Sequence, residues 1–240
     1  MAKLLVLSLA ETTSDKEKGY AVIARNLDNN SWVIIPTLSK KLFKIDGKYV
    51  WDIFAVTEAD IVRKLENRND VYEVISDNYV PYLSEPACKS NKKRKEILEE
   101  LSLSSVSELQ ESPSWVGILR NPKIDDLYFF KRMQERAAYD LKQTYYWECR
   151  LEFKDVYGYY WEYKAAPGVA VKDMRFKAYW RDLMLSREEA FTEKKIKWIN
   201  YMQENDTYLL IEFYPSRYLN SVAVISGVLC INKKEVRRDN

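Results

Sequence analysis

Short runs of apolar, β-branched and aromatic residues, each closed by turn-forming residues, recur along the chain. Lys3–Leu9 is the first run, and Gly19–Arg25 and Trp32–Pro36 flank an Asp-Asn-Asn turn at 28–30. Runs of this length separated by such turns are typical of antiparallel strands. The first 36 residues therefore predict a three-stranded β-meander. Many short strands also favour small barrels or sandwiches over a parallel α/β sheet.

The rest of the first half mixes predicted strands with short helices. The strand candidates are Lys48–Val56, Val71–Ile75 and Tyr79–Leu83. Three helices are predicted, namely Glu58–Leu65 capped by Thr57, Glu96–Leu103 after a basic run, and Val106–Gln110 capped by Ser104 or Ser105. Ser-Pro-Ser at 112–114 and Asn-Pro at 121–122 then indicate a domain boundary. We expect one domain over residues 1–121 and a second over 122–240.

The second half returns to strands. The candidates are Asp126–Met133, Tyr139–Lys154, Thr207–Tyr214 and Val222–Asn232, with a hairpin between Tyr146–Phe153 and Tyr159–Lys164. Met174–Leu185 fits either a helix or a loop. Ser186 followed by two glutamates predicts the start of a helix over 187–204. The fold class expected from these patterns is mainly β with helical insertions (α+β), arranged as two small barrels in tandem.

The absence of histidine excludes several mechanisms. No Ser-His or Cys-His nucleophile pair and no His-ligated zinc site can form in these 240 residues. Neither a Walker-type loop nor a G-x-G-x-x-G segment is present. We therefore expect a binding module rather than an enzyme, with no cofactor.

The charge balance and the cysteines limit which binding partners and which cellular compartment we expect. Lys plus Arg is 38 and Asp plus Glu is 36, so a nucleic-acid surface would need local clustering of charge. The three cysteines are widely spaced and predict neither a disulfide framework nor a zinc cluster. With no apolar run of about 18 residues, we expect no membrane partner and a cytoplasmic protein.

Aromatic residues are the first candidate binding groups, since the chain has 18 Tyr, 8 Phe and 7 Trp. We select Trp147, Tyr159 and Trp161, because exposed rings beside basic residues form stacking platforms for single-stranded bases. The alternative is that alternating aromatics fill a β core. Alternation turns only half of the rings inward, so some are expected at the surface.

Basic residues are the second candidate set. Lys92, Lys93 and Arg94 lie in the strongest basic run, Lys89–Lys95, while Arg150 and Lys154 lie among the aromatic clusters. Each is a candidate contact for phosphate. The alternative is that the run is a solvated loop or the start of a helix.

Asp140, Glu152 and Lys154 loosely match the Asp…Glu-x-Lys spacing of Mg²⁺-dependent nucleases. In such sites two acids hold the metal and a lysine steadies the attacking water. On a half-buried strand, however, Glu-x-Lys is an ordinary solvent face.

The order of these segments resembles the dual OB-containing domain family of prokaryotic conflict-system proteins. The similar segments are Leu4–Ser8, Gly19–Ala24, Trp32–Pro36, Val50–Ile53, Leu151–Gly158, Thr207–Phe213 and Val222–Leu229. The chain departs from the pattern where Ile35 replaces an arginine before Pro36 and where Gly19-Tyr20 replaces an Arg-Cys pair. The resemblance implies two OB-like barrels and a nucleic-acid-binding or ligand-sensing role.

Together these observations predict a non-enzymatic module that binds nucleic acid in a prokaryotic or viral conflict context. A protein-interaction or scaffold subunit of a defence-related complex is the first alternative, and a Mg²⁺-dependent nuclease is the second. The choice among DNA, RNA and a protein partner stays open, as does the oligomeric state.

Overall fold

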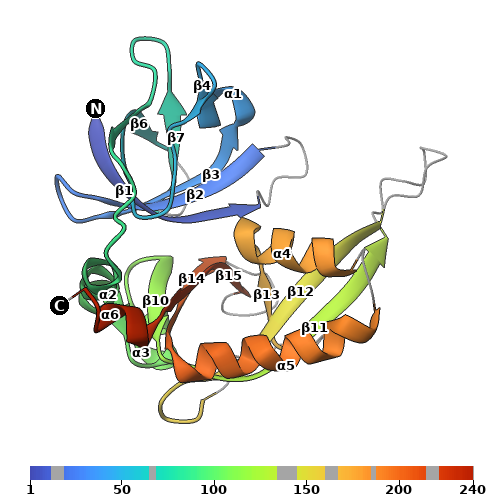
Figure 1. Ribbon diagram of the computed structural model, residues 1–240. Helices are drawn as coiled ribbons and strands as arrows, with labels where there is room; N and C mark the ends of the chain where they lie inside the picture. The colour runs from blue at the N-terminus through green and yellow to red at the C-terminus, as the bar shows by residue number, and fades with distance from the viewer. Residues whose placement is uncertain are drawn as a thin grey trace.

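A computed structural model describes residues 1–11, 19–64, 69–133, 145–159, 167–184, 188–214 and 222–239. Two large β-sheets, one two-stranded hairpin and a few helices make up these residues (Figure 1), which confirms the predicted mainly β, α+β class. In the described ranges, no helix is both long enough and apolar enough to cross a membrane.

The first sheet contains six strands from the first third of the chain. They are β1 (Ala2–Glu11), β2 (Gly19–Asn26), β3 (Trp32–Ser39), β6 (Val56–Arg63), β7 (Tyr72–Ile75) and β8 (Tyr82–Glu85). Their order is β3-β2-β1-β6-β7, with β8 also paired to β6. The predicted meander is confirmed as β1, β2 and β3. At the far side, β7 meets β3 through one parallel bridge between Ile34 and Val71.

Residues 40–63 differ from the prediction. A short helix, α1 (Lys40–Phe43), leads into a hairpin of β4 (Lys44–Ile45) and β5 (Lys48–Tyr49). The predicted strand ends there, and residues 50–55 form a connection instead, buried except for Asp52. The predicted helix Glu58–Leu65 is wrong, because β6 pairs with β1, β7 and β8. Sheet pairing overrides the weak local helical pattern here.

The second sheet contains seven strands. They are β9 (Ser102–Leu103), β10 (Val116–Arg120), β11 (Lys123–Met133), β12 (Tyr145–Lys154), β13 (Val169–Val171), β14 (Asp206–Tyr214) and β15 (Val222–Ile231). Their order is β11-β12-β13-β15-β14-β10-β9. Only the β13–β15 and β10–β9 pairs are parallel. β10 and β11 are consecutive in the chain, and Asn121 between them has a φ of 46°.

Five further helices accompany the sheets within the described ranges. They are α2 (Asn91–Leu101), α3 (Val106–Glu111), α4 (Met174–Met184), α5 (Glu188–Glu204) and α6 (Lys233–Val236). α3 is the predicted helix, and the Ser105 side chain accepts the Glu108 N–H as its cap. α2 begins earlier than predicted, since Ser90 caps it, so the basic run lies mostly on this helix. The expected cap Ser186 lies outside the described residues.

The strand pairing of the second half places β12 between two neighbours. β12 pairs with β11 along one edge and with β13 along the other. Of the predicted hairpin partner 159–164, the described residues include only Tyr159, which lies in a loop. The second sheet also includes β9 and β10, which precede residue 121.

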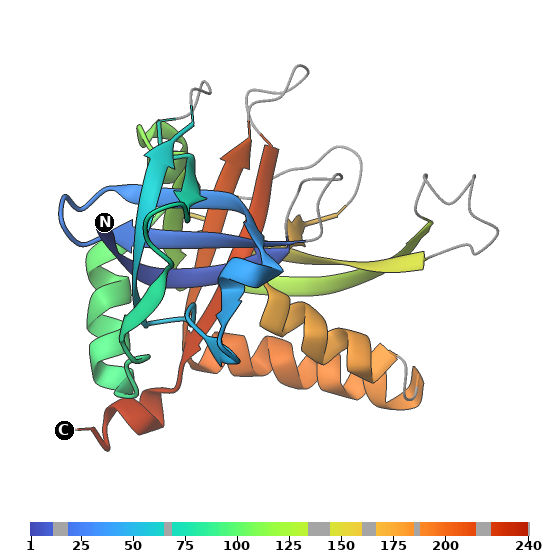
Figure 2. The same cartoon turned by 90° about the horizontal axis from the view of Figure 1, so that it is seen from above.

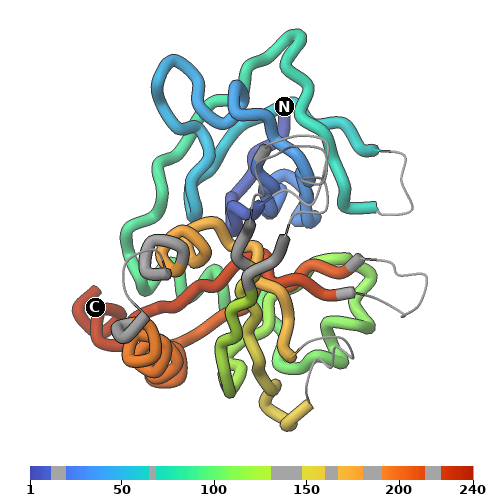
Figure 3. Tube along the Cα trace, turned by 90° about the vertical axis from the view of Figure 1, so that its right-hand side faces the viewer, coloured from blue at the N-terminus to red at the C-terminus, as the bar shows by residue number. Residues whose placement is uncertain are grey.

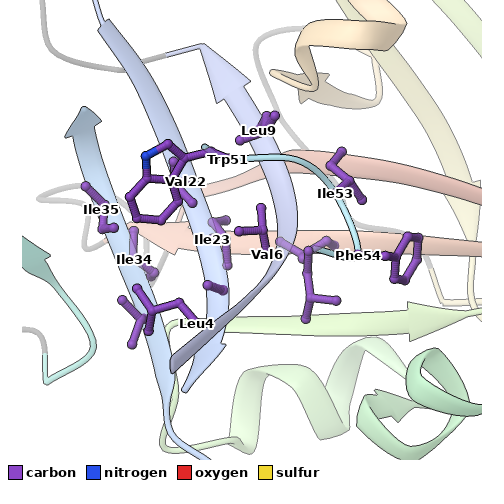
Figure 4. Close-up of a cluster of buried hydrophobic side chains, with 14 of the residues drawn as sticks. Leu4, Val6, Leu9, Val22, Ile23, Ile34, Ile35, Trp51, Ile53 and Phe54 are labelled. Carbon is purple, nitrogen blue, oxygen red and sulfur yellow. The ribbon is translucent and has the colours of Figure 1, made fainter. Parts of the chain in front are cut away.

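The two sheets stack on each other and share a core. Figures 1 and 3 show the first sheet above the second, with β1 next to the β14–β15 pair. The first core gathers Leu4, Val6, Ile23 and Trp51, which Figure 4 shows between β1, β2, β3 and the 50–55 connection. The same cluster includes Val116, Ile118, Tyr208, Leu210, Leu229 and Ile231 of the second sheet. A second core lies between the second sheet and helices α3, α4 and α5.

Candidate functional site

A cleft of about 370 Å³ lies where the two sheets meet. Its walls come from four places far apart in the sequence: the 52–54 turn, α2, the α4–α5 pair and the end of β15. Figure 2 shows α4 and α5 side by side. The residues at the mouth are charged or aromatic.

The 52–54 turn forms the upper wall, and β1 holds it in place. The Phe54 N–H donates to the Val6 carbonyl at 2.7 Å, and the Val6 N–H donates to Ala55 at 2.9 Å. Phe54 has a φ of 65°, which is rare for a bulky residue and is maintained only by such surrounding contacts. The turn leaves the Asp52 carboxylate exposed at the cleft, where, among the described residues, it accepts only the N–H of its neighbour Ile53 at 2.7 Å.

Arg94 reaches the cleft from the second turn of α2. Its Nε donates to the Cys88 carbonyl at 2.5 Å, and its guanidinium lies 5.2 Å from the Phe54 ring centroid. These two contacts orient the side chain. Among the described residues, neither terminal amino group of Arg94 has a protein partner. The guanidinium therefore presents two donors to a ligand.

Arg175 stands at the start of α4, beside a carboxylate that is already engaged. Asp173 is buried, and its Oδ1 accepts the N–H groups of Arg175 and Phe176 at 2.9 and 3.0 Å. Its Oδ2 accepts the Val228 N–H at 2.9 Å. The Arg175 guanidinium is 4.0 Å from Asp173, and its side chain is 56% exposed. Asp173 therefore serves as the helix cap, while Arg175 faces solvent.

Three rings form a row across α4 and α5. Tyr179 and Trp198 meet edge to face at 5.3 Å, and Trp198 meets Tyr201 in the same way at 5.8 Å. Tyr179 and Tyr201 are 39% and 38% exposed, whereas Trp180 behind them is fully buried. Burial raises the pKa of the Tyr201 phenol, so this ring is uncharged at neutral pH. The row therefore presents an aromatic surface to a ligand, and the buried ring behind it supports that surface.

Cys230 lines the cleft as a thiol rather than a thiolate. Burial raises the pKa of the Cys230 thiol to about 11, so this cysteine is protonated at neutral pH. It lies 3.5 Å from the Thr207 hydroxyl. The groups at the cleft are thus suited to contact a ligand by charge, hydrogen bonding and stacking.

Of the residues selected from the sequence whose side chains the structure describes, Arg94 alone lines this cleft. Lys92 and Lys93 are exposed on the first turn of α2, next to it in sequence. Tyr159 is 62% exposed in the loop after β12, where Asp155 accepts its N–H at 2.9 Å. Trp161 and the Trp147 side chain lie outside the part of the chain that the structure describes.

Arg150 and Lys154 are engaged within the protein. Arg150 is buried and donates to the carbonyls of Pro167 and Gly168 and to Glu148. It stabilises the turn before β13 and is not positioned to contact phosphate. Lys154 forms an ion pair with Asp125 at 3.2 Å and is 27% exposed.

The structure describes two of the three residues of the nuclease pattern, Glu152 and Lys154. Glu152 accepts the Tyr128 hydroxyl at 2.5 Å, and this bond raises the pKa of Tyr128 to about 12. Asp140 lies outside the described ranges. Within them, no group of three or more carboxylate or cysteine side chains could hold a metal ion.

Arg175, Tyr179, Trp198 and Tyr201 were not selected from the sequence. Met174–Leu185 fitted either a helix or a loop, so its exposed face was not defined. The spacing of Trp198 and Tyr201, three residues apart, does place both rings on one helical face. That spacing is the signal that could have pointed to the site.

Comparisons with protein-family models, with curated proteins and with solved structures find no significant match for this chain. Its function therefore has to be argued from the site itself.

Proposed function

We propose that this protein is a binding module that takes part of a single-stranded nucleic acid into the cleft between its two sheets. One observation carries the proposal: Arg94 and Arg175 stand in the same cleft as a row of three partly exposed rings. Guanidinium groups bind phosphate oxygens through paired donors, and tyrosine and tryptophan rings stack on bases. The Asp52 carboxylate can accept hydrogen bonds from a base edge.

A single strand fits this site better than a duplex. The rings line a cleft between α4, α5 and the 52–54 turn, and a base that stacks on them has to leave its own stack. Unpaired bases offer both faces for stacking at low cost. The nearly balanced total charge is also compatible with a local site, because Arg94 and Arg175 place two guanidinium groups beside the rings, while Asp52 and Asp173 line the same cleft.

We further propose that each half is an OB-like, partly open barrel. In that fold the first strand pairs with the second and the fourth, and the third lies parallel to the fifth. In the first half β1 pairs with β2 and β6, and β3 meets β7 in the parallel bridge. In the second half β10 and β11 act as one bent first strand, and β13 pairs with β15 in parallel.

The positions of the helices along the chain also fit the OB-like strand order. α1 lies between the third and fourth strands of the first half, and α4 and α5 occupy the same place in the second. OB folds often bind oligonucleotides, although the fold alone does not define the ligand. The resemblance to dual OB-containing conflict-system proteins would place this binding in a prokaryotic or viral defence context.

An exposed apolar strip favours a second candidate, a protein-interaction subunit. Tyr79, Val80, Tyr82 and Leu83 around β8 are 53%, 52%, 42% and 39% exposed. Contiguous exposed apolar residues mark many protein-contact surfaces. A stable partner captured from the native host without nucleic acid, and lost with Leu83→Asp, would favour this role.

The binding proposal is tested by fluorescence-anisotropy titration of labelled DNA and RNA strands of about 12 nucleotides. Tyr201→Leu should weaken binding roughly 5- to 100-fold, because one base loses its stacking partner. Arg94→Gln should reduce the slope of log binding constant against log salt concentration by about 0.7, which is the value for one lost phosphate contact on a single strand. Tyr79→Leu, an exposed tyrosine outside the cleft, serves as the matched control and should bind as the wild type does.

No binding at low salt would contradict the proposal. So would equal affinities of the wild type, Arg94→Gln and Tyr201→Leu for every strand tested.

A further inference from the structure

A second cluster of positive charge lies on the hairpin formed by residues 40–49, outside the cleft. Lys40, Lys41, Lys44 and Lys48 are all exposed on α1, β4 and β5. Among the described residues, none of these four lysines forms an ion pair with a carboxylate. Asp46 in the turn is the one acidic residue of the segment. The hairpin therefore carries unneutralised positive charge.

The hairpin also presents an aromatic ring on a rigid support. Tyr49 is 61% exposed, and the Lys44 ammonium lies 5.1 Å from its ring centroid. Behind it, Phe43 packs against Tyr49 at 5.6 Å and against Tyr20 of β2 at 4.3 Å. The buried Trp51 donates to the Leu42 carbonyl at 2.9 Å and so fastens the hairpin to the core.

The hairpin is joined to the cleft wall through the chain. The buried Val50 and Trp51 connect Tyr49 to the Asp52–Phe54 wall. Figures 1 and 2 show α1 on the same side of the molecule as α4. A strand longer than the cleft can therefore extend toward the hairpin on that side.

The arrangement of the lysines indicates the kind of ligand. They are spread over three elements rather than converging on one point, so they do not form a pocket for a single small anion. A chain of regularly spaced phosphates can contact several of them at once. The exposed Tyr49 ring adds a surface on which an unpaired base can stack.

We propose that the 40–49 hairpin is a second contact site for the backbone of the same single strand whose bases enter the cleft. This inference rests on the proposed function and extends it. The cleft binds a few nucleotides, and the hairpin determines how long a strand is needed for full affinity.

The experiment compares two variants with two strand lengths. Lys44→Gln/Lys48→Gln removes two charges beside Tyr49, and Lys3→Gln/Lys234→Gln removes two exposed charges elsewhere. Figure 1 shows that the start of β1 and α6 lie away from α1. Each variant is titrated between about 50 and 200 mM salt with a strand of about 12 nucleotides and with a trinucleotide. Thermal unfolding followed by circular dichroism verifies that both variants fold.

On the longer strand, the slope of log binding constant against log salt concentration should be smaller by about 1.4 for the hairpin variant. This corresponds to two phosphate contacts at about 0.7 each. The trinucleotide should bind the hairpin variant as it binds the wild type, because it fills only the cleft. The control variant should match the wild type on both strands.

Two results would overturn the inference, and they can be told apart. If the hairpin variant matches the control on the longer strand while Arg94→Gln still weakens binding, the proposed hairpin contact is wrong and the proposed cleft site is retained. If the wild type binds neither strand, or Arg94→Gln has no effect, the cleft proposal fails and the hairpin extension fails with it.

Discussion

At the scale of single residues, Gly168 occupies a backbone position that leaves no room for a side chain. Its φ is +68°, and an added Cβ would lie 2.7 Å from the Leu151 carbonyl oxygen. Arg150 donates to the carbonyl of the same glycine. The turn before β13 therefore depends on a glycine and on a buried arginine acting together.

Gly168→Ala should destabilise the protein more than Gly158→Ala does. Both glycines have positive φ, which costs an alanine about 1–2 kcal/mol, but Gly158 has nothing within 4 Å of an added Cβ. The extra clash at Gly168 involves backbone atoms, which cannot move aside. Urea unfolding of the two variants measures the difference, and equal free energies of unfolding would contradict this account.

At the scale of elements, helix α2 positions Arg94, and α2 itself is docked by Lys95. The Lys95 ammonium pairs with the Asp206 carboxylate of β14 at 2.7 Å. The Asp206 side chain is 8% exposed, and the hydrogen bond to it raises the pKa of Lys95. The contact joins the helix to the second sheet.

Lys95→Met should cost about 1–3 kcal/mol of stability, because it leaves a mostly buried carboxylate without its closest partner. Lys197→Met is the matched control: its exposed pair with Glu193 should contribute far less to stability. Chemical denaturation gives both values. If the two substitutions cost the same, the docking role assigned to Lys95 is refuted.

At the scale of the whole molecule, the first core contains residues from both sheets. Leu4 and Ile23 of the first sheet share one cluster with Ile118 and Leu210 of the second. The buried Ser8 hydroxyl of β1 also donates to the Ser226 carbonyl of β15. The halves are therefore expected to unfold together rather than as two independent domains.

Calorimetry should show a single unfolding transition, and Leu210→Ala should lower the midpoint temperature of that whole transition. The substitution removes a fully buried side chain and should cost about 2–5 kcal/mol. Ile196→Ala, at a position 54% exposed, should leave the transition nearly unchanged. Two separate transitions, only one of them shifted by Leu210→Ala, would show that the halves unfold independently.

Local patterns in the sequence were sufficient for part of this architecture. The meander β1–β3, the strands β14 and β15 and the capped helix α3 follow from apolar periodicity, turn residues and caps, all of which act between near neighbours. Arg94 was likewise selected from a basic run. These features need no knowledge of the distant chain.

Contacts between distant parts of the chain determined the remaining features of the fold and the site. β6 is a strand because β1 and β8 flank it, although its local pattern favoured a helix. Arg150 is buried by a turn 17 residues away. The cleft brings Arg94 next to Arg175 and Tyr201, residues that no local signal connects. Side-chain type sets the chemistry available to this protein, but burial and neighbours, which only the folded chain defines, decide which of those side chains can meet a ligand.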